Sequence, residues 1–455
     1  MTSLSDLDIA ALTEGYASGK LDPVEVVQDG LSRIDEVDGA LHAVYDRFDE
    51  EALAAAAASR SRWGKGIPLS PLDGVPVTLK ENQSMIGRPT PWGSATTKQA
   101  PAAQNAPVVD RMLSAGAAVL ARTTMPELGM LSSGVSSLHE TTRNPWNLAW
   151  SPGGSSGGAG AASAAGYAPV NLGSDIGGSV RLPASWCGVA GFKPTYARIP
   201  VDPPYPARTI GPMGRRVADI ARSMAVLEGA HPADPWSFPA EGIEWTDLHL
   251  NISELRVGLV IDLGDGAPAD PEVAAVIRRA ADVFAAAGAD VVEIGPYIAP
   301  GTIDLIDRFW RAGHWRKYKR MPQEQRERML PFIAEWCRSG AGVTGEEALD
   351  AHDAQLTMAR ATLFATQDVD VVLSPVSPGA AFPAEWPMPS NDVNDPMAHI
   401  GFCVVYNMSG QPAACVNGGF TGQGSPVGVQ IAAGRHADRT ALAAAAFFET
   451  ARSED

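Results

Sequence analysis

Apolar residues recur at helical spacing through the first sixty residues of the chain. We expect one helix to open at Leu7 to Leu12, a second to run from Pro23 to Val37, and an alanine-rich third from Glu51 to Arg62. A turn at Pro71 to Gly74 leads into Val75 to Leu79, a short apolar run typical of a strand. The chain therefore begins with helices and enters a sheet near residue 75.

Farther along, helical and extended patterns alternate. A helix is expected from Pro107 to Ala115, and residues 119–120 indicate the strand after it. The clearest unit is a strand from Leu255 to Ile261, a helix that is capped by Asp270 and runs to Gly288, and a strand from Val291 to Ile294. These three elements predict a right-handed crossover in a parallel or mixed sheet. Two more strands are expected at 369–373 and 426–431, and the last helix at 440–450.

Three stretches depart from this alternation. Alanine-rich residues 161–172 are expected to form a helix, and residues 301–365, which mix tryptophans with Arg, Glu and Gln, to form several. Residues 374–398 are rich in proline and predict a surface loop. No stretch has the character of a flexible interdomain linker, so we expect one continuous α/β domain. We place its N-terminal helices at 1–62 and its core at 68–230. The helical elaboration is placed at about 301–365, and the closing strands and helix at 366–455.

Charge and composition exclude several classes of partner. The chain has 52 acidic and 35 basic residues, a formal charge of −17 and a pI near 4.9. Such a surface repels phosphate backbones and anionic lipid, so neither nucleic acid nor a membrane is expected as a partner. The four cysteines form no CxxC pair, no leader is visible, and no apolar run reaches the ~20 residues of a membrane span. We therefore expect a cytoplasmic protein. The eight histidines show no ligand spacing, so neither a metal nor a cofactor is expected.

The most informative stretch is Ser151 to Gly160, followed by Gly173 to Ser179. A flexible linker is disfavoured because folded patterns flank the stretch. A Walker-type phosphate loop would need a lysine after its last glycine, and none stands there. Gly153 to Gly157 does match the nucleophile elbow Gly-x-Ser-x-Gly, but no strand precedes it and no histidine downstream stands out as a base.

A lysine base is the fourth interpretation. Lys80 directly follows the apolar run at Val75 to Leu79, so a strand carries this residue toward the interior. Burial disfavours the ammonium form and lowers the pKa, which a lysine general base requires. The alternative is a strand-end lysine that extends to water, and on this residue alone that alternative is the stronger one.

Taken together, several motifs resemble those of the amidase signature family, over nearly the whole chain. The most specific are the two Gly–Ser blocks, whose Ser155 and Ser179 lie 24 residues apart. The resemblance implies a large twisted mixed β-sheet covered by helices on both faces, in a single domain that hydrolyses amides. The matching stretches are 71–82, 144–146, 152–158, 173–184, 187–195, 407–413 and 426–430.

The resemblance also implies roles for individual residues. Ser179 matches the nucleophile, Ser155 the bridging serine that follows a cis peptide bond, and Lys80 the base. A neutral Lys80 would take the proton of the Ser179 hydroxyl through Ser155 and later return one to the leaving amine. Two charged neighbours of the nucleophile, Asp175 and Arg181, are expected to hold its loop. The turn whose backbone N–H groups form the oxyanion hole matches Ile176, Gly177 and Gly178.

The identity of the substrate is less defined. Ile176 stands where many members have Thr, as in a subset that acts on hydrophobic amides, and residues 196–207 are shorter and richer in proline than is usual. Ile176, Met130, Trp386 and the tryptophan-bearing helices favour an apolar pocket. We therefore expect an aryl or alkyl amide as the substrate, with esters and carbamates (urethanes) as further candidates.

Two other functions stay open. One is the glutaminase-type A subunit of a tRNA-dependent amidotransferase, which would need a partner protein and glutamine; Ile176 weighs against it. The other is a non-catalytic binding protein, which would have no need of Lys80, Ser155 and Ser179 together. The expected partners are a small-molecule amide and water, and a homodimer is expected by family analogy only.

Overall fold

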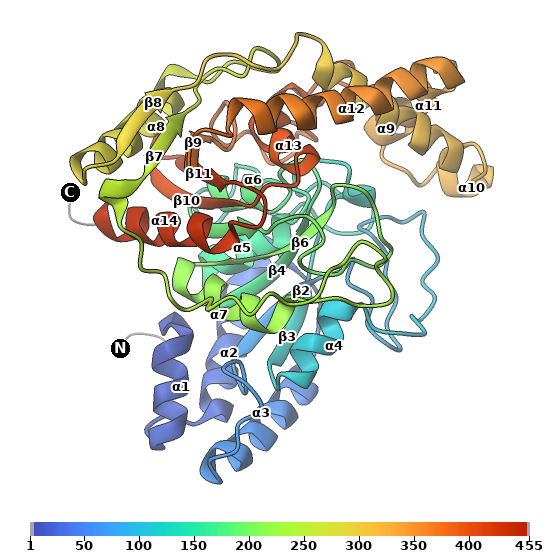
Figure 1. Ribbon diagram of the computed structural model, residues 1–455. Helices are drawn as coiled ribbons and strands as arrows, with labels where there is room; N and C mark the ends of the chain where they lie inside the picture. The colour runs from blue at the N-terminus through green and yellow to red at the C-terminus, as the bar shows by residue number, and fades with distance from the viewer. Residues whose placement is uncertain (1–3, 453–455) are drawn as a thin grey trace.

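The computed structural model describes residues 4–452, and a mixed sheet of 11 strands lies at its centre. Helices lie on both sides of this sheet, as Figure 1 shows. The predicted α/β architecture is therefore confirmed. The strands follow one another across the sheet in the order β1 (Val44–Arg47), β3 (Ala118–Thr123), β2 (Pro76–Lys80), β4 (Val170–Asp175), β6 (Thr209–Gly214), β5 (Ala190–Lys193), β10 (Ala413–Phe420), β11 (Pro426–Ala433), β9 (Val371–Pro375), β7 (Arg256–Leu259) and β8 (Asp290–Glu293).

Strand β2 lies parallel to both of its neighbours, β3 and β4, whereas β4 pairs antiparallel with β6. All residues of β2, β3 and β4 are buried, because helices cover both faces of the sheet. Since parallel strands end at the same edge, the last residues of β2 and β4, Lys80 and Asp175, come to neighbouring places. This edge carries the candidate site.

The helices pack on the sheet through separate groups of buried apolar side chains. Those that contribute to one group are α1 (Ile9–Ser18), α4 (Pro107–Ser114), α7 (Val217–Leu227), α8 (Pro271–Ala286) and α14 (Asp438–Ala451). The two remaining groups include α3 (Asp49–Gly64), α5 (Gly157–Ala165), α6 (Arg181–Trp186), α9 (Thr302–Tyr318), α11 (Pro331–Ser339), α12 (Gly345–Ala365) and α13 (Gly401–Met408). Helix α2 (Pro23–Leu41) contributes side chains to the first group and to one of the other two.

The predicted helix starts have identifiable caps. The Asp8 carboxylate accepts a hydrogen bond from the Ala11 N–H of α1, and the Asp22 carboxylate accepts one from the Val24 N–H of α2. The crossover unit is confirmed, because β7 and β8 pair in parallel around α8. The cap predicted at its start differs in detail. Asp270 occupies the N-cap position of α8, but its side chain makes no capping hydrogen bond.

The helix predicted at 161–172 is wrong in its bounds. Helix α5 begins at Gly157 and ends at Ala165, and Val170 to Asp175 form strand β4. The glycines at the start of α5 suggest a loop by intrinsic propensity. They are helical here because the helix lies against neighbouring backbone: a Cβ atom on Gly158 would stand 2.5 Å from the Thr124 nitrogen.

The helices expected at 301–365 are present as α9, α10 (Gln323–Arg326), α11 and α12, and Figure 1 shows them at the end of the molecule away from α1 to α3. No helix or strand is assigned between Pro375 and Ala398, as expected for the proline-rich stretch. In the described part of the chain, no helix is long and apolar enough to cross a membrane.

Candidate active site

The side chain of Lys80 ends among three serine hydroxyls. Its Nζ lies 2.8 Å from the Oγ of Ser155, 3.0 Å from that of Ser156 and 3.2 Å from that of Ser174. Lys80 is the last residue of β2 and has no solvent exposure. The strand therefore delivers this amine into the interior, and the alternative of a strand-end lysine that extends to water is wrong.

The surroundings of Lys80 favour its neutral form. Burial is the main cause that lowers the pKa of Lys80, to about 7; the Arg208 charge acts in the same direction, and the Glu81 and Asp175 charges oppose the shift. No carboxylate forms an ion pair with this amine among the described residues. A neutral amine has two N–H groups and one lone pair, so it can accept a hydrogen bond from one of the three hydroxyls while it donates to the other two.

Ser155 lies in the loop directly before α5. The peptide bond between Gly154 and Ser155 is cis, as the resemblance implied. Gly154 is enclosed by backbone, since a Cβ atom there would stand 2.6 Å from the carbonyl oxygens of both Leu131 and Ser133. A larger residue at position 154 would therefore displace the serine that contacts Lys80.

Ser179 lies in the turn between β4 and α6. It is partly exposed and lines the same cavity as Ser155. Its carbonyl oxygen accepts a hydrogen bond from the Ser156 N–H at 3.2 Å, which joins the two Gly–Ser blocks. The Ser179 hydroxyl makes no hydrogen bond to another described residue. The structure thus brings Ser155 and Ser179 to one cavity, and Lys80, which is buried outside the cavity lining, contacts Ser155 directly.

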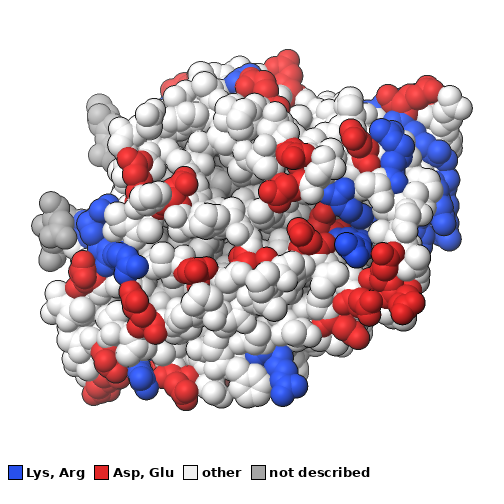
Figure 2. Space-filling view, turned by 90° about the horizontal axis from the view of Figure 1, so that it is seen from above, with Lys and Arg blue, Asp and Glu red and all other residues white. Residues whose placement is uncertain are grey.

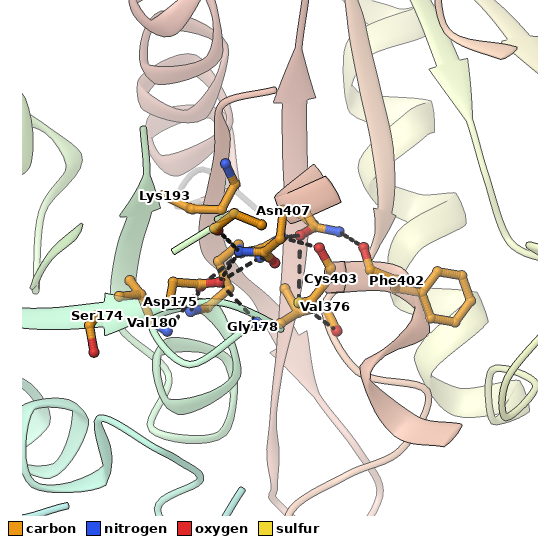
Figure 3. A network of polar contacts seen from close by, with 12 residues as sticks. Ser174, Asp175, Gly178, Val180, Lys193, Val376, Phe402, Cys403 and Asn407 are labelled. Carbon is orange, nitrogen blue, oxygen red and sulfur yellow. Dashed lines mark hydrogen bonds and ion pairs between the residues drawn. The ribbon is translucent and has the colours of Figure 1, made fainter. Parts of the chain in front are cut away.

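A buried network holds the turn that carries Ser179. The Asp175 carboxylate accepts hydrogen bonds from the Gly178 and Val180 N–H groups, the Arg181 guanidinium and the Asn407 amide, all at 2.9–3.0 Å. Figure 3 shows this carboxylate between Gly178 and Asn407. Burial alone would raise the pKa of Asp175, but the Arg181 charge and these hydrogen bonds hold it well below its usual range. Asp175 and Arg181 therefore hold the loop, as expected from the sequence.

The prediction that the Gly178 N–H belongs to the oxyanion hole does not fit this network. That N–H already donates to Asp175, and the positive φ of Gly178, 113°, shapes the turn instead. The N–H groups of the other two predicted residues, Ile176 and Gly177, and that of Ser179 have no partner among the described residues. These three are the free donors beside the nucleophile.

A cavity of about 400 Å³ opens over Ser155 and Ser179. Met130 lies in its wall, and its contact with a substrate stays a prediction. Trp386 does not line it: this prediction is wrong, because the side chain is 38% exposed on the surface and lies outside the cavity wall. The proline-rich stretch that contains Trp386 reaches the cavity through Met388 and Met397 instead.

Most of the cavity wall was not predicted from the sequence. Trp310 of α9 and Trp336 of α11 belong to the tryptophan-bearing helices, whose general involvement was expected without a choice of residues. Arg208 and Lys317 are charged wall residues that no sequence motif singled out. The only sequence signal near Arg208 was the unusual proline-rich segment directly before it.

The geometry can be compared with known proteins. The family model described as Amidase matches residues 25–442. The chain belongs to the amidase signature family. This amidase is 35% identical over 457 residues to an acylamidase of Rhodococcus erythropolis, with 98% of this chain and 95% of the relative covered. It is 33% identical over 474 residues to the A subunit of a glutamyl-tRNA(Gln) amidotransferase from Chloroflexus aggregans, with 97% and 95% covered.

A solved structure supports the same conclusion. A bacterial aryl acylamidase of the amidase signature family superposes on this amidase with a TM-score of 0.89 and 29% identity, over 98% of this chain and 96% of that one. The family and these relatives together show that the amidase hydrolyses carbon–nitrogen amide bonds. Among the described residues, no group of three or more His, Cys, Asp or Glu side chains could hold a metal ion.

Proposed function

We propose that the amidase cleaves linear amides through an acyl-enzyme on Ser179. The Ser179 oxygen attacks the carbonyl carbon while its proton passes to the Ser155 oxygen and the Ser155 proton passes to neutral Lys80. The carbon–nitrogen bond then breaks, and the leaving amine takes a proton back along the same path. Water attacks the resulting ester in the same manner, which releases the acid and restores the Ser179 hydroxyl.

One observation carries this proposal: the 2.8 Å contact between a fully buried lysine and the Ser155 hydroxyl. A lysine with a pKa of about 7 has a substantial neutral fraction in neutral solution, and this neutral amine can accept the proton that a serine nucleophile must lose. The Asp175 carboxylate is paired with Arg181, so it is not available as the base.

The N–H groups of Ile176, Gly177 and Ser179 are the proposed oxyanion donors. They are free of other partners in the described structure and belong to the turn that carries the nucleophile. Loss of one such donor costs about 100-fold or more in rate in comparable sites. Backbone donors do not depend on the side chain at position 176, so isoleucine there is compatible with catalysis.

The wall of the cavity favours aryl or alkyl amides as substrates. Trp310, Trp336, Met130 and Ile400 present apolar surface to the space above Ser179. Two relatives have names that agree with this substrate class, an acylamidase and an aryl acylamidase. Esters and carbamates offer the same carbonyl to Ser179 and are included in the proposal, whereas a cytoplasmic location and a homodimer stay predictions.

The relative named as the A subunit of a glutamyl-tRNA(Gln) amidotransferase favours a second candidate, a glutaminase that works with a partner protein. Glutamine is small and polar, and the apolar wall suits it less well than it suits an aryl amide. Glutamine hydrolysis at a rate above that of every aryl and alkyl amide tested would favour this second function.

Labelling with a fluorophosphonate probe and mass mapping of the modified peptide test the assignment of the nucleophile. We expect the label on Ser179, with no label in Ser179→Ala and full label in Ser390→Ala, which removes an exposed serine of the proline-rich stretch. Hydrolysis of an amide and ester panel is measured on the same variants. Label on another serine, with activity retained in Ser179→Ala, would overturn the proposal.

A further inference from the structure

The cavity wall carries positive side chains that no acidic side chain neutralises. Arg208 and Lys317 both line the cavity and form no ion pair with a described residue. Among the described residues, the only carboxylate at the wall is that of Asp175, which is already paired with Arg181 at 2.9 Å. A third basic residue, His314, is neutral, because burial, with the Lys317 charge, lowers its pKa to about 3. The charge presented to a ligand is therefore positive.

Arg208 is placed as a receptor for an anion. It directly precedes β6, its guanidinium lies 5.7 Å from the centre of the Trp92 ring, and one Nη donates to the Pro203 carbonyl oxygen. Its Nε is buried and has no hydrogen-bond partner. The Asp202 and Asp234 charges raise the pKa of Arg208, but neither carboxylate forms an ion pair with it. Burial lowers the pKa of Arg208 to about 10, so the group is still charged in neutral solution.

Lys317 belongs to a basic run at the end of α9. From Arg308 to Gln323 the chain has six Lys and Arg residues and no acidic one, in a protein of net charge −17. The helix dipole stabilises cations at a helix C-terminus, which explains why basic residues gather at the end of α9. It does not explain why one of them lies at the cavity. Lys317 lies at the cavity wall, and Figure 2 shows Lys and Arg gathered at the end of the molecule where α9 to α11 lie. Four members of the run form no ion pair among the described residues: Arg316, Lys317, Lys319 and Arg320.

We propose that the preferred substrate is an amide with an apolar body and a carboxylate remote from the scissile bond, and that Arg208 and Lys317 receive this carboxylate. The inference rests on the proposed function and specifies the substrate class of the same site. The planar guanidinium matches the two oxygens of a carboxylate. A cavity of about 400 Å³ suits a small molecule of this kind.

Matched 4-nitroanilides test this inference through the release of 4-nitroaniline. The acyl group is 5-carboxypentanoyl in the first compound, the mono-anilide of adipic acid. It is hexanoyl in the neutral analogue and 6-aminohexanoyl in the cationic one. A second pair, N-hexanoyl-4-aminobenzoate and N-hexanoylaniline, places the carboxylate on the amine side. We expect kcat/KM for the carboxylate member of at least one pair to exceed that of its neutral analogue by about tenfold or more, mainly through KM. The cationic analogue is expected to be the poorest substrate.

Variants locate the effect in the cavity wall. In Arg208→Gln and in Lys317→Gln the ratio of carboxylate to neutral kcat/KM is expected to fall several-fold. The ratio cancels any general change in folding or in Lys80, which Arg208 influences. Lys319→Gln is the matched control, since it removes the same charge two residues away and outside the cavity wall. Its ratio is expected to stay near that of the wild type.

Three results would overturn the inference: equal kcat/KM within both pairs, a ratio that survives in both wall variants, or an equal loss in Lys319→Gln, which would indicate general attraction by the basic run. Efficient hydrolysis of the neutral anilides in any of these cases leaves the proposed function intact. If none of the amides or esters is hydrolysed and Ser179 takes no label, the proposed function itself fails.

Discussion

At the scale of single residues, burial alone does not make a lysine a base. Lys193 is as deeply buried as Lys80, and burial lowers its pKa to about 7 as well. Yet the Lys193 side chain donates to the Pro194 carbonyl oxygen at 3.0 Å. Lys80 differs in its neighbours, three hydroxyls of which one belongs to a serine at the cavity. Contacts, not the pKa, therefore distinguish the two.

The pKa of Lys80 sets the pH dependence of activity. Below about pH 7 the amine is protonated and cannot accept a proton, so kcat/KM for a neutral amide is expected to rise as pH increases through about 7 and then to level off. Initial rates from pH 5 to 10 at low substrate concentration measure this profile. A maximum near pH 5, with a fall toward neutral pH, would contradict a lysine base.

At the scale of elements, the sequence predicted well where each element is stable by its own pattern. Strand β2 and helices α1 and α2 follow their apolar spacing, and both helices have side-chain caps. Helix α5 was misplaced because its three glycines have poor helix propensity, and only their packing against segments such as Thr124 and Pro183 makes them helical. Such tertiary packing is not visible in a local pattern.

Alanine substitution in two helices tests this packing. Gly158→Ala in α5 is expected to destabilise the protein by about 1–3 kcal/mol, because the new Cβ would overlap with the Thr124 backbone. Gly313→Ala in α9 is the matched control, since its Cβ would meet nothing within 4 Å and alanine is the better helix former by about 1 kcal/mol. Chemical denaturation measures both. A stabilised Gly158→Ala would refute the close approach.

At the scale of the whole molecule, the site combines segments that are far apart in the sequence. The motifs predicted Lys80, Ser155 and Ser179 as a set, and the structure brings the two serines to one cavity with Lys80 in contact with Ser155. The strand order and the cavity wall could not be predicted, because they depend on contacts between distant segments. Trp386 was chosen for its residue type, whereas Trp310 and Trp336 reach the cavity through the packing of α9 and α11. The division into parts at 1–62, 68–230, about 301–365 and 366–455 stays a prediction.

Glu127 joins the helical elaboration to the core and so shapes the cavity. Its buried carboxylate accepts hydrogen bonds from the Leu330 N–H at 2.7 Å and from the hydroxyls of Ser94 and Ser137 at 2.6 and 2.7 Å. Glu127→Gln replaces one acceptor oxygen with a donor, so we expect KM for a bulky anilide to rise about tenfold, and KM for a small aliphatic amide to rise less. Glu324→Gln, at an exposed position, is the control. If Glu127→Gln and Glu324→Gln had the same KM for the bulky anilide, this role of Glu127 would be excluded.

The most direct test of the account is the turnover of Lys80→Ala on the best amide substrate, after circular dichroism has shown that the variant is folded. Without its proton acceptor, Ser179 becomes a poor nucleophile, and we predict that kcat falls by about 100-fold or more. The variant is expected to show no recovery at high pH, because no amine is left to deprotonate. A folded Lys80→Ala enzyme with turnover within about twofold of the wild type would contradict the central claim.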